Sequence, residues 1–99
     1  MPQLTVAGPT FYSSKDEARF FSWLESIPGV TRVVGEGRDL QVTLRSSRLG
    51  EEALRELIAL HWRYRLPMRH LAAFLSPTNE HWFAAPGMYW RKAVFGATP

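Results

Sequence analysis

The chain has 99 residues, of which 45% are apolar and 13% aromatic, and its formal net charge is +3. This composition excludes an intrinsically disordered chain, which would have few aromatic residues and a high net charge. The sequence holds no cysteine, which excludes a disulfide framework and a cysteine nucleophile. We therefore expect a single domain that spans residues 1–99.

The expected compartment follows from three features that the sequence lacks. A secreted chain of this size usually depends on disulfides, so the absence of cysteine favours the reducing cytosol. The N-terminal segment MPQLTVAGPT has no basic stretch followed by a long apolar run, so we expect no signal peptide. No apolar run approaches the roughly 20 residues of a membrane span. We expect a cytoplasmic protein without a membrane partner.

The first third of the chain predicts two β-prone segments and then a helix. Gln3–Ala7 alternates polar and apolar residues, and Thr10–Ser13 resumes β-prone chemistry after a Gly-Pro pair. One bent edge strand or two short strands both fit this pattern. Ser14 and Glu17 have the spacing of a capping box, which predicts a helix from Ser14 to about Ile27. The apolar side of this helix comprises Phe20, Phe21, Trp23, Leu24 and Ile27.

A β-hairpin is expected next. Val30–Val34 is rich in β-branched residues, and Gly35–Asp39 supplies two glycines for a turn. In Leu40–Arg45 apolar and polar residues alternate, which indicates a strand with one buried face.

The longest helix-periodic run lies in the second half of the chain. We expect Ser47 to be its N-cap, and we expect the helix to end at about Arg65, because the residue before Pro67 avoids the helical region. His61 falls near the middle of its apolar band, and Trp62 falls at the edge. The rest of the band comprises Ala53, Leu54, Leu57, Ile58, Leu60 and Tyr64.

Short helices are expected to complete the chain. Pro67 suits the first turn of a new helix, and Ser76 with a following proline predicts another that runs to about Phe83. Met88–Phe95 predicts a last short helix, and Gly96–Pro99 a frayed tail. Together these elements predict an α+β fold of order β-α-β-β-α, with a small, mainly antiparallel sheet, two main helices on one face and short C-terminal helices.

Basic residues gather in the C-terminal part. Residues 1–56 carry seven Lys/Arg and eight Asp/Glu, whereas residues 57–99 carry five Lys/Arg and one acid. Such asymmetry indicates an acidic partner, either protein or nucleic acid. The segment HWRYRLPMRH places arginines beside aromatic residues. The candidate partner-binding residues are Trp62, Arg63, Arg65, Arg69 and His70.

Three interpretations of this segment stay open. Arg, Trp and Tyr are enriched at protein–protein hot spots, which favours a protein partner or a homodimer. A weak nucleic-acid binder would use the same arginines with Arg91 and Lys92, while the rings stack on bases. In the third interpretation the arginine stems cover the domain's own apolar surface or pair with its acids, and the segment binds nothing.

No motif indicates metal binding or catalysis. His61, His70 and His81 lack the i,i+4 spacing that places two imidazoles on one helix face, and the chain has no Gly-x-Ser-x-Gly elbow. We therefore expect no metal, no cofactor and no enzymatic activity. We interpret His61 as a core histidine with one ring nitrogen hydrogen-bonded.

Three runs, FFSWLESIPGV, LRELIALHWRYRLPMRHLAAFL and NEHWF, resemble a group of small bacterial proteins without an assigned activity. The resemblance spans about Phe11 to Phe95 and includes no catalytic motif, so it implies no site residue. Some similar domains act as immunity or interaction partners in bacterial conflict systems. The resemblance implies a cytoplasmic α+β domain that acts by binding. We expect a non-enzymatic protein-interaction domain, immunity-like or self-associating, with weak nucleic-acid binding as the alternative.

Overall fold

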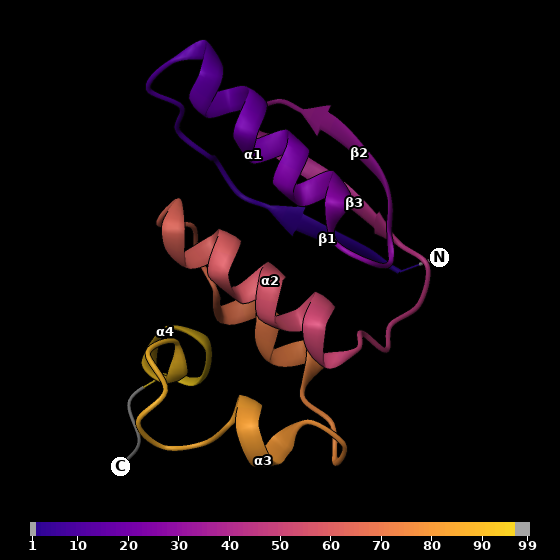
Figure 1. Cartoon of the computed structure of the whole chain (residues 1–99), viewed down its shortest axis with the longest axis vertical. Helices are drawn as coiled ribbons and strands as arrows, with labels where there is room; N and C mark the ends of the chain where they lie inside the picture. Colours follow the sequence, from indigo (N-terminus) through magenta and orange to yellow (C-terminus); the bar gives the residue numbers. More distant parts are fainter. Residues whose placement is uncertain (1, 97–99) are drawn as a thin grey trace.

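The computed structural model describes residues 2–96 and contains three strands, four α-helices and one 3-10 helix in that range. In chain order these are β1 (Gln3–Val6), α1 (Ser14–Ser26), β2 (Val30–Glu36), β3 (Asp39–Leu44), α2 (Glu51–Arg63), the 3-10 helix η1 (Arg69–Phe74), α3 (Glu80–Phe83) and α4 (Arg91–Phe95). The strands form one antiparallel sheet in the order β1-β3-β2 (Figure 1). The predicted α+β fold of order β-α-β-β-α followed by short helices is confirmed.

The central strand β3 is buried on one face, as its alternation predicts. Leu40, Val42 and Leu44 are buried, whereas the residues between them are half-buried. The β1 strand adds Leu4 and Val6 to the same buried face. Because the side-chain period of a strand is two, this register places all five apolar side chains against the helices.

The segment Thr10–Ser13 is irregular, and the prediction that it resumes a strand is wrong. Gly8 adopts a positive φ of 57°, which turns the chain out of the sheet after β1. The segment then leads to the start of α1, where its last residue, Ser13, is the N-cap of the helix.

The helix cap of α1 lies one residue earlier than the predicted capping box. Ser13, not Ser14, is the N-cap, and its Oγ accepts a hydrogen bond from the Asp16 amide at 3.1 Å. The Asp16 carboxylate accepts from the Tyr12 amide at 3.0 Å, so it binds the residue before the N-cap and not the N-cap amide that a capping box uses. The predicted capping box is therefore wrong, although a serine one residue earlier does cap the helix.

The helix α2 is the central element of the domain, with α1 and the sheet on one side of it and α3 and α4 on the other (Figure 1). The predicted apolar band of α2 is buried except at Tyr64, which lies one residue past the helix and is half-buried, and His61 within the band has 0% exposure. The predicted N-cap is wrong, because Gly50 rather than Ser47 precedes the helix and no side chain caps it. The Gly50 carbonyl accepts from the Leu54 amide at 3.0 Å, so the backbone alone closes the first turn.

The C-terminal segments are shorter than predicted. Pro67 begins no α-helix, and the 3-10 helix η1 starts two residues after it. Ser76 does not directly precede the helix, because α3 has Asn79 in the N-cap position. The Ser76 backbone amide instead donates to the Asn79 side-chain oxygen at 2.9 Å in the turn before the helix. Asn79 Nδ2 also donates to the Phe74 carbonyl at 2.8 Å. The buried Asn79 therefore closes this turn, and α3 begins only at Glu80.

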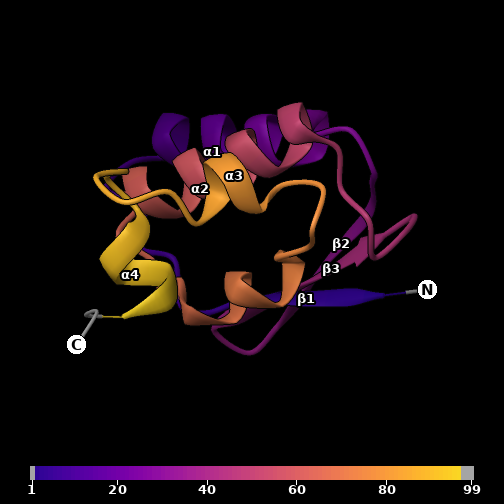
Figure 2. The same cartoon turned by 90° about the horizontal axis from the view of Figure 1, so that it is seen from below.

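Figure 2 shows α1 and α2 in one layer, with the sheet and η1 in the other. The predicted last helix is present as α4, which Val94 and the preceding Trp90 anchor with buried side chains. None of the helices in residues 2–96 combines the length and the apolarity that crossing a bilayer requires. Residues 97–99 of the expected tail lie outside the described part of the chain.

Candidate functional site

The helix α2 ends in a Schellman motif that has an arginine at the position where glycine is usual. The Leu66 amide donates to the His61 carbonyl at 2.9 Å, and the Arg65 amide donates to the Trp62 carbonyl at 3.2 Å. Arg65 has a φ of 56° and is the only non-glycine residue in the described range with a positive φ. This motif ends the helix at Arg63, earlier than Pro67 alone predicts.

Replacing Arg65 by glycine is expected to stabilise the fold. A left-handed backbone costs a residue with a Cβ about 1 kcal/mol relative to glycine, so the Arg65→Gly variant should gain about that free energy of unfolding. Urea denaturation measures it. The control is Arg63→Ala, which removes a neighbouring guanidinium without changing the strained position and should give no such gain. A destabilised Arg65→Gly variant would show that packing of the Arg65 side chain outweighs its backbone strain.

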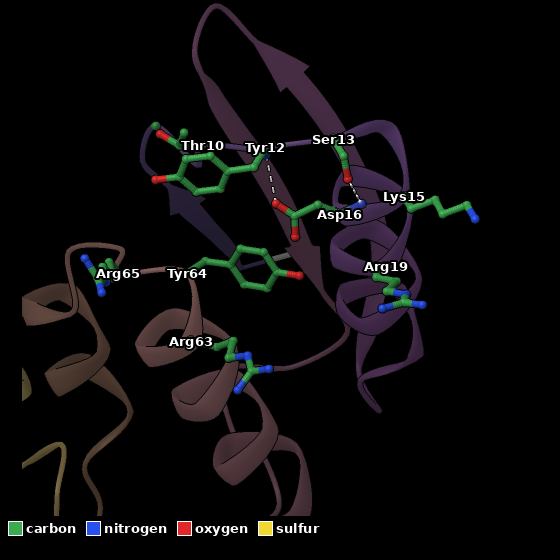
Figure 3. Close-up of a pocket in the computed structure, with 10 residues that line it drawn as sticks. Thr10, Tyr12, Ser13, Lys15, Asp16, Arg19, Arg63, Tyr64 and Arg65 are labelled. Atoms are coloured by element: carbon green, nitrogen blue, oxygen red, sulfur yellow. Dashed lines mark hydrogen bonds between the residues drawn. The ribbon is translucent and has the colours of Figure 1, made fainter.

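A cationic groove lies between the start of α1 and the end of α2, with a volume of about 710 Å³ (Figure 3). We define it by its four basic lining residues, Lys15, Arg19, Arg63 and Arg65. The one acidic residue in the lining is Asp16, and most of the remaining lining residues carry hydroxyl groups. Tyr12 at its edge is 90% exposed. The groove is thus an open, positively charged hollow with polar hydrogen-bonding groups.

The four cations of the groove have no ionic partner among residues 2–96. Across residues 2–96 the single ion pair joins Arg55 to Glu51 at 2.8 Å, on another part of α2. The Asp16 carboxylate is engaged by the Tyr12 amide at 3.0 Å. In Figure 3 the cationic side chains stand around the rim instead of converging on one point, and Lys15 extends outward. This arrangement suits several separated negative charges better than one compact anion.

Tyr64 forms the wall between the groove and the core. Its ring meets the Phe20 ring edge to face, with centroids 4.8 Å apart and planes at 86°. Burial, and then the nearby Asp16 carboxylate, raises the pKa of Tyr64 above its usual value. Tyr64 therefore stays protonated at neutral pH and presents a neutral hydroxyl group among the cations.

A second cavity, of about 460 Å³, opens on the other side of Arg65. We call it the His61 hollow. It is lined by His61, Trp62, Arg65, Leu66, Met68 and Ala93. Arg65 lines both cavities, so they form adjoining parts of one surface at the end of α2. Trp62 is 49% exposed at its rim, and its ring meets the equally exposed Tyr89 ring at 5.1 Å.

Two histidine rings lie side by side in the interior. His61 Nδ1 donates to the Leu57 carbonyl at 2.8 Å, as expected of a core histidine. The centroid of the His70 ring lies 5.2 Å away from that of His61, so His70 is half-buried rather than grouped with the exposed arginines. The Nε2 atoms of both rings are buried and have no hydrogen-bond partner in the described part of the chain.

The remaining basic candidates are placed apart from the groove. The Arg69 guanidinium packs against Gly96, where it leaves no room for a Cβ. Arg91 Nε donates to the Ala84 carbonyl at 3.1 Å, and its guanidinium lies 4.9 Å from the centre of the Phe95 ring. Neither residue lines the cationic groove or the His61 hollow. Arg91 therefore packs against the domain's own surface.

Sequence reasoning missed half of the cationic groove. Lys15 and Arg19 fall on the polar side of the predicted first helix, where they look like ordinary solvated residues. They join Arg63 and Arg65 only because α1 packs beside α2 with the Phe20–Tyr64 contact between them. No local sequence pattern indicated Tyr89 either, although its ring forms an exposed aromatic pair with Trp62. Nothing local in the sequence marks such contacts.

Comparison of the chain with protein-family models, curated proteins and solved structures finds no match. In residues 2–96 no three or more His, Cys, Asp or Glu side chains gather in a way that could hold a metal ion. Asp16 lines the cationic groove and His61 lines the other cavity, so the carboxylate and the imidazole are not brought into one cavity. The chemistry of the two cavities is the basis for a functional proposal.

Proposed function

We propose that the protein is a non-enzymatic interaction domain whose cationic groove binds an acidic segment of a partner protein. The observation that carries this proposal is the set of four cations around one open hollow, none of which has an ionic partner in the described part of the chain. Burying an acidic segment there would bring carboxylates to guanidinium groups, which form strong, often bidentate, hydrogen bonds. The immunity-type role implied by the resemblance would be one biological form of such binding.

A protein partner fits the surface better than nucleic acid does. Strong phosphate-backbone binders place many basic residues along one face, whereas here Arg69 and Arg91 are held by contacts elsewhere in the domain. Beyond Arg65 the surface continues into exposed aromatic rings, which are typical of protein–protein hot spots.

The test is a titration with a labelled hexaglutamate peptide at low salt, followed by fluorescence anisotropy. The double variant Arg63→Glu/Arg65→Glu should bind at least about tenfold more weakly, because each reversal replaces an attraction by a repulsion. Raising the salt concentration should weaken wild-type binding, because exposed charges are screened. The control is the double variant Arg38→Glu/Arg48→Glu, which changes the net charge equally at two exposed arginines outside the groove.

Equal loss in the control variant would mean that only net charge matters and would contradict a site in the groove. Single- and double-stranded oligonucleotides are titrated in parallel. Tighter binding of an oligonucleotide than of hexaglutamate, lost in the groove variant, would favour the nucleic-acid alternative instead. Light scattering of the unliganded protein decides whether it also forms a homodimer.

A further inference from the structure

The strand β2 forms an open edge of the sheet (Figure 1). It has seven residues, and among residues 2–96 no strand pairs with its outer side, whereas the other edge strand, β1, has only four residues. Free edges are usually blocked by proline, by bulges or by charged side chains. The one irregularity of β2 lies at its start, between Val30 and Arg32. The rest of the strand, Arg32–Glu36, is regular, and we call it the β2 edge.

The backbone of the β2 edge offers free hydrogen-bonding groups at Val33 and Gly35. The amide of Arg45, directly after β3, donates at 2.7 Å to the carbonyl of the residue that precedes β2. Because backbone direction alternates along a strand, Gln41 of β3 also faces β2, and its partner Val34 faces back toward β3. The two residues that flank Val34 therefore direct their N–H and C=O groups away from the sheet, where a further strand would bind them.

The side chains at the β2 edge separate into two faces. Val33 pairs with the buried Val42, which places it on the core face of the sheet. Arg32, Val34 and Glu36 alternate with it and lie on the opposite face. Figure 2 shows the two long helices in the other layer, so this face of the sheet is not covered by them. Val34 is 41% exposed there, and the two charged residues have no ionic partner among residues 2–96.

The β2 edge is complementary to a second copy of itself in one register. In an antiparallel pair with Val34 of both copies at the two-fold axis, Val33 faces Gly35 of the second copy, and each such pair exchanges its backbone hydrogen bonds. Arg32 then faces Glu36 of the second copy on both sides of the axis. Moving the axis by one residue places Arg32 opposite a valine or opposite another arginine. Opposite charges at equal distances from Val34 therefore favour this register.

We propose that the β2 edge pairs with the β2 edge of a second copy of the chain, so that the two sheets join across a two-fold axis at Val34. The joined sheet buries the exposed Val34 side chain against its counterpart and satisfies the free backbone groups of both edges. No residue of the β2 edge lines the cationic groove, so this self-association is independent of the proposed function.

Sedimentation equilibrium of the whole chain, at concentrations up to about 1 mM, tests the proposal. The wild type should form a dimer. Arg32→Glu and Glu36→Arg should each dimerise at least about tenfold more weakly, because each places like charges opposite one another on both sides of the axis. An equimolar mixture of the two variants should dimerise again, because every cross-strand pair then joins a carboxylate to a guanidinium. The control Arg48→Glu, at an exposed arginine outside β2, should keep wild-type dimerisation.

A wild type that stays monomeric up to about 1 mM overturns the proposal. So does a dimer that the two reversals leave unchanged, or a mixture that does not restore association. If a variant does not fold, amide hydrogen exchange of the wild type decides. The amides of Val33 and Gly35 should exchange several-fold more slowly at high protein concentration, whereas the Val34 amide, bonded within the sheet, should not respond. Concentration-dependent protection confined to other parts of the domain overturns the proposal.

Discussion

Acidification from pH 7 to pH 4 is expected to cost the fold about 3 kcal/mol through His61 alone. Burial lowers the pKa of His61 from 6.5 to about 4, against the opposing effect of its bond to the Leu57 carbonyl. Between these two values the unfolded chain binds a proton that the folded protein does not. Stability is therefore unaffected above about pH 6.5 and falls as the pH drops toward 4.

The neighbouring His70 acts in the same direction, because burial lowers its pKa too. A proton on either ring would also repel a proton on the other, whose centroid is 5.2 Å away. Urea denaturation at a series of pH values measures the effect. His61→Gln should reduce the loss between pH 6.5 and 4, whereas His81→Gln should leave it unchanged. A wild-type profile that matches that of His61→Gln would contradict the assigned cause.

The Phe20→Ala substitution is expected to lower the free energy of unfolding by about 3–5 kcal/mol. Phe20 is fully buried, and its ring makes edge contacts with the rings of Phe11, Phe21 and Tyr64. Removing it leaves a cavity where α1 meets α2. A domain of this length has a total stability of about 5–15 kcal/mol, so the loss is a large share of the whole.

The same substitution should weaken hexaglutamate binding, because the Phe20–Tyr64 contact holds the two walls of the cationic groove together. Phe20→Leu, which fills much of the cavity, should cost less than half as much stability. Ser22→Ala changes an exposed residue of the same helix and should have little effect on either property. A loss below about 1.5 kcal/mol for Phe20→Ala would mean that the aromatic cluster is dispensable.

We expect substitutions at Phe20 and Arg65 to change the free energy of unfolding in opposite directions, because Phe20 lies in the packed core and Arg65 has a strained backbone at the surface. Phe20 belongs to a packed cluster whose loss is costly. Arg65 occupies a backbone conformation that glycine would adopt at lower cost, and Arg65 is the residue that both cavities share. Strain of this kind concentrates at functional sites. Comparing the stability and the hexaglutamate affinity of Arg65→Gly therefore tests whether the strain serves binding.

Half of the candidate site was accessible to sequence reasoning. The arginine and aromatic segment after Leu60 was selected because its residue types are typical of binding surfaces, and Trp62, Arg63 and Arg65 do line the two cavities. Its neighbours His70 and Arg69 were selected on the same grounds but lie elsewhere, because the turn after Arg65 redirects the chain. Composition identifies such a segment, but it does not say which way each side chain points.

The sequence by itself determined the order of the elements and the faces that they bury. Alternation in β3 and helical periodicity in α2 are local patterns, and burial follows them closely, including the burial of His61. In α1 the pattern is followed in part, because Phe20 and Leu24 are buried whereas Phe21 and Trp23 are half-buried. The cap positions and the lengths of the short helices depend on hydrogen bonds that compete within a few residues, such as those of Asn79, and these were misplaced.

Only the tertiary structure decided the site. The cationic groove exists because the packing of α1 beside α2 brings Lys15 and Arg19 to Arg63 and Arg65 across more than 40 residues of sequence. The unpaired His61 nitrogen is likewise visible only once every neighbour is placed. Charge and hydrogen-bonding needs are encoded residue by residue, but whether they are met depends on contacts between distant segments.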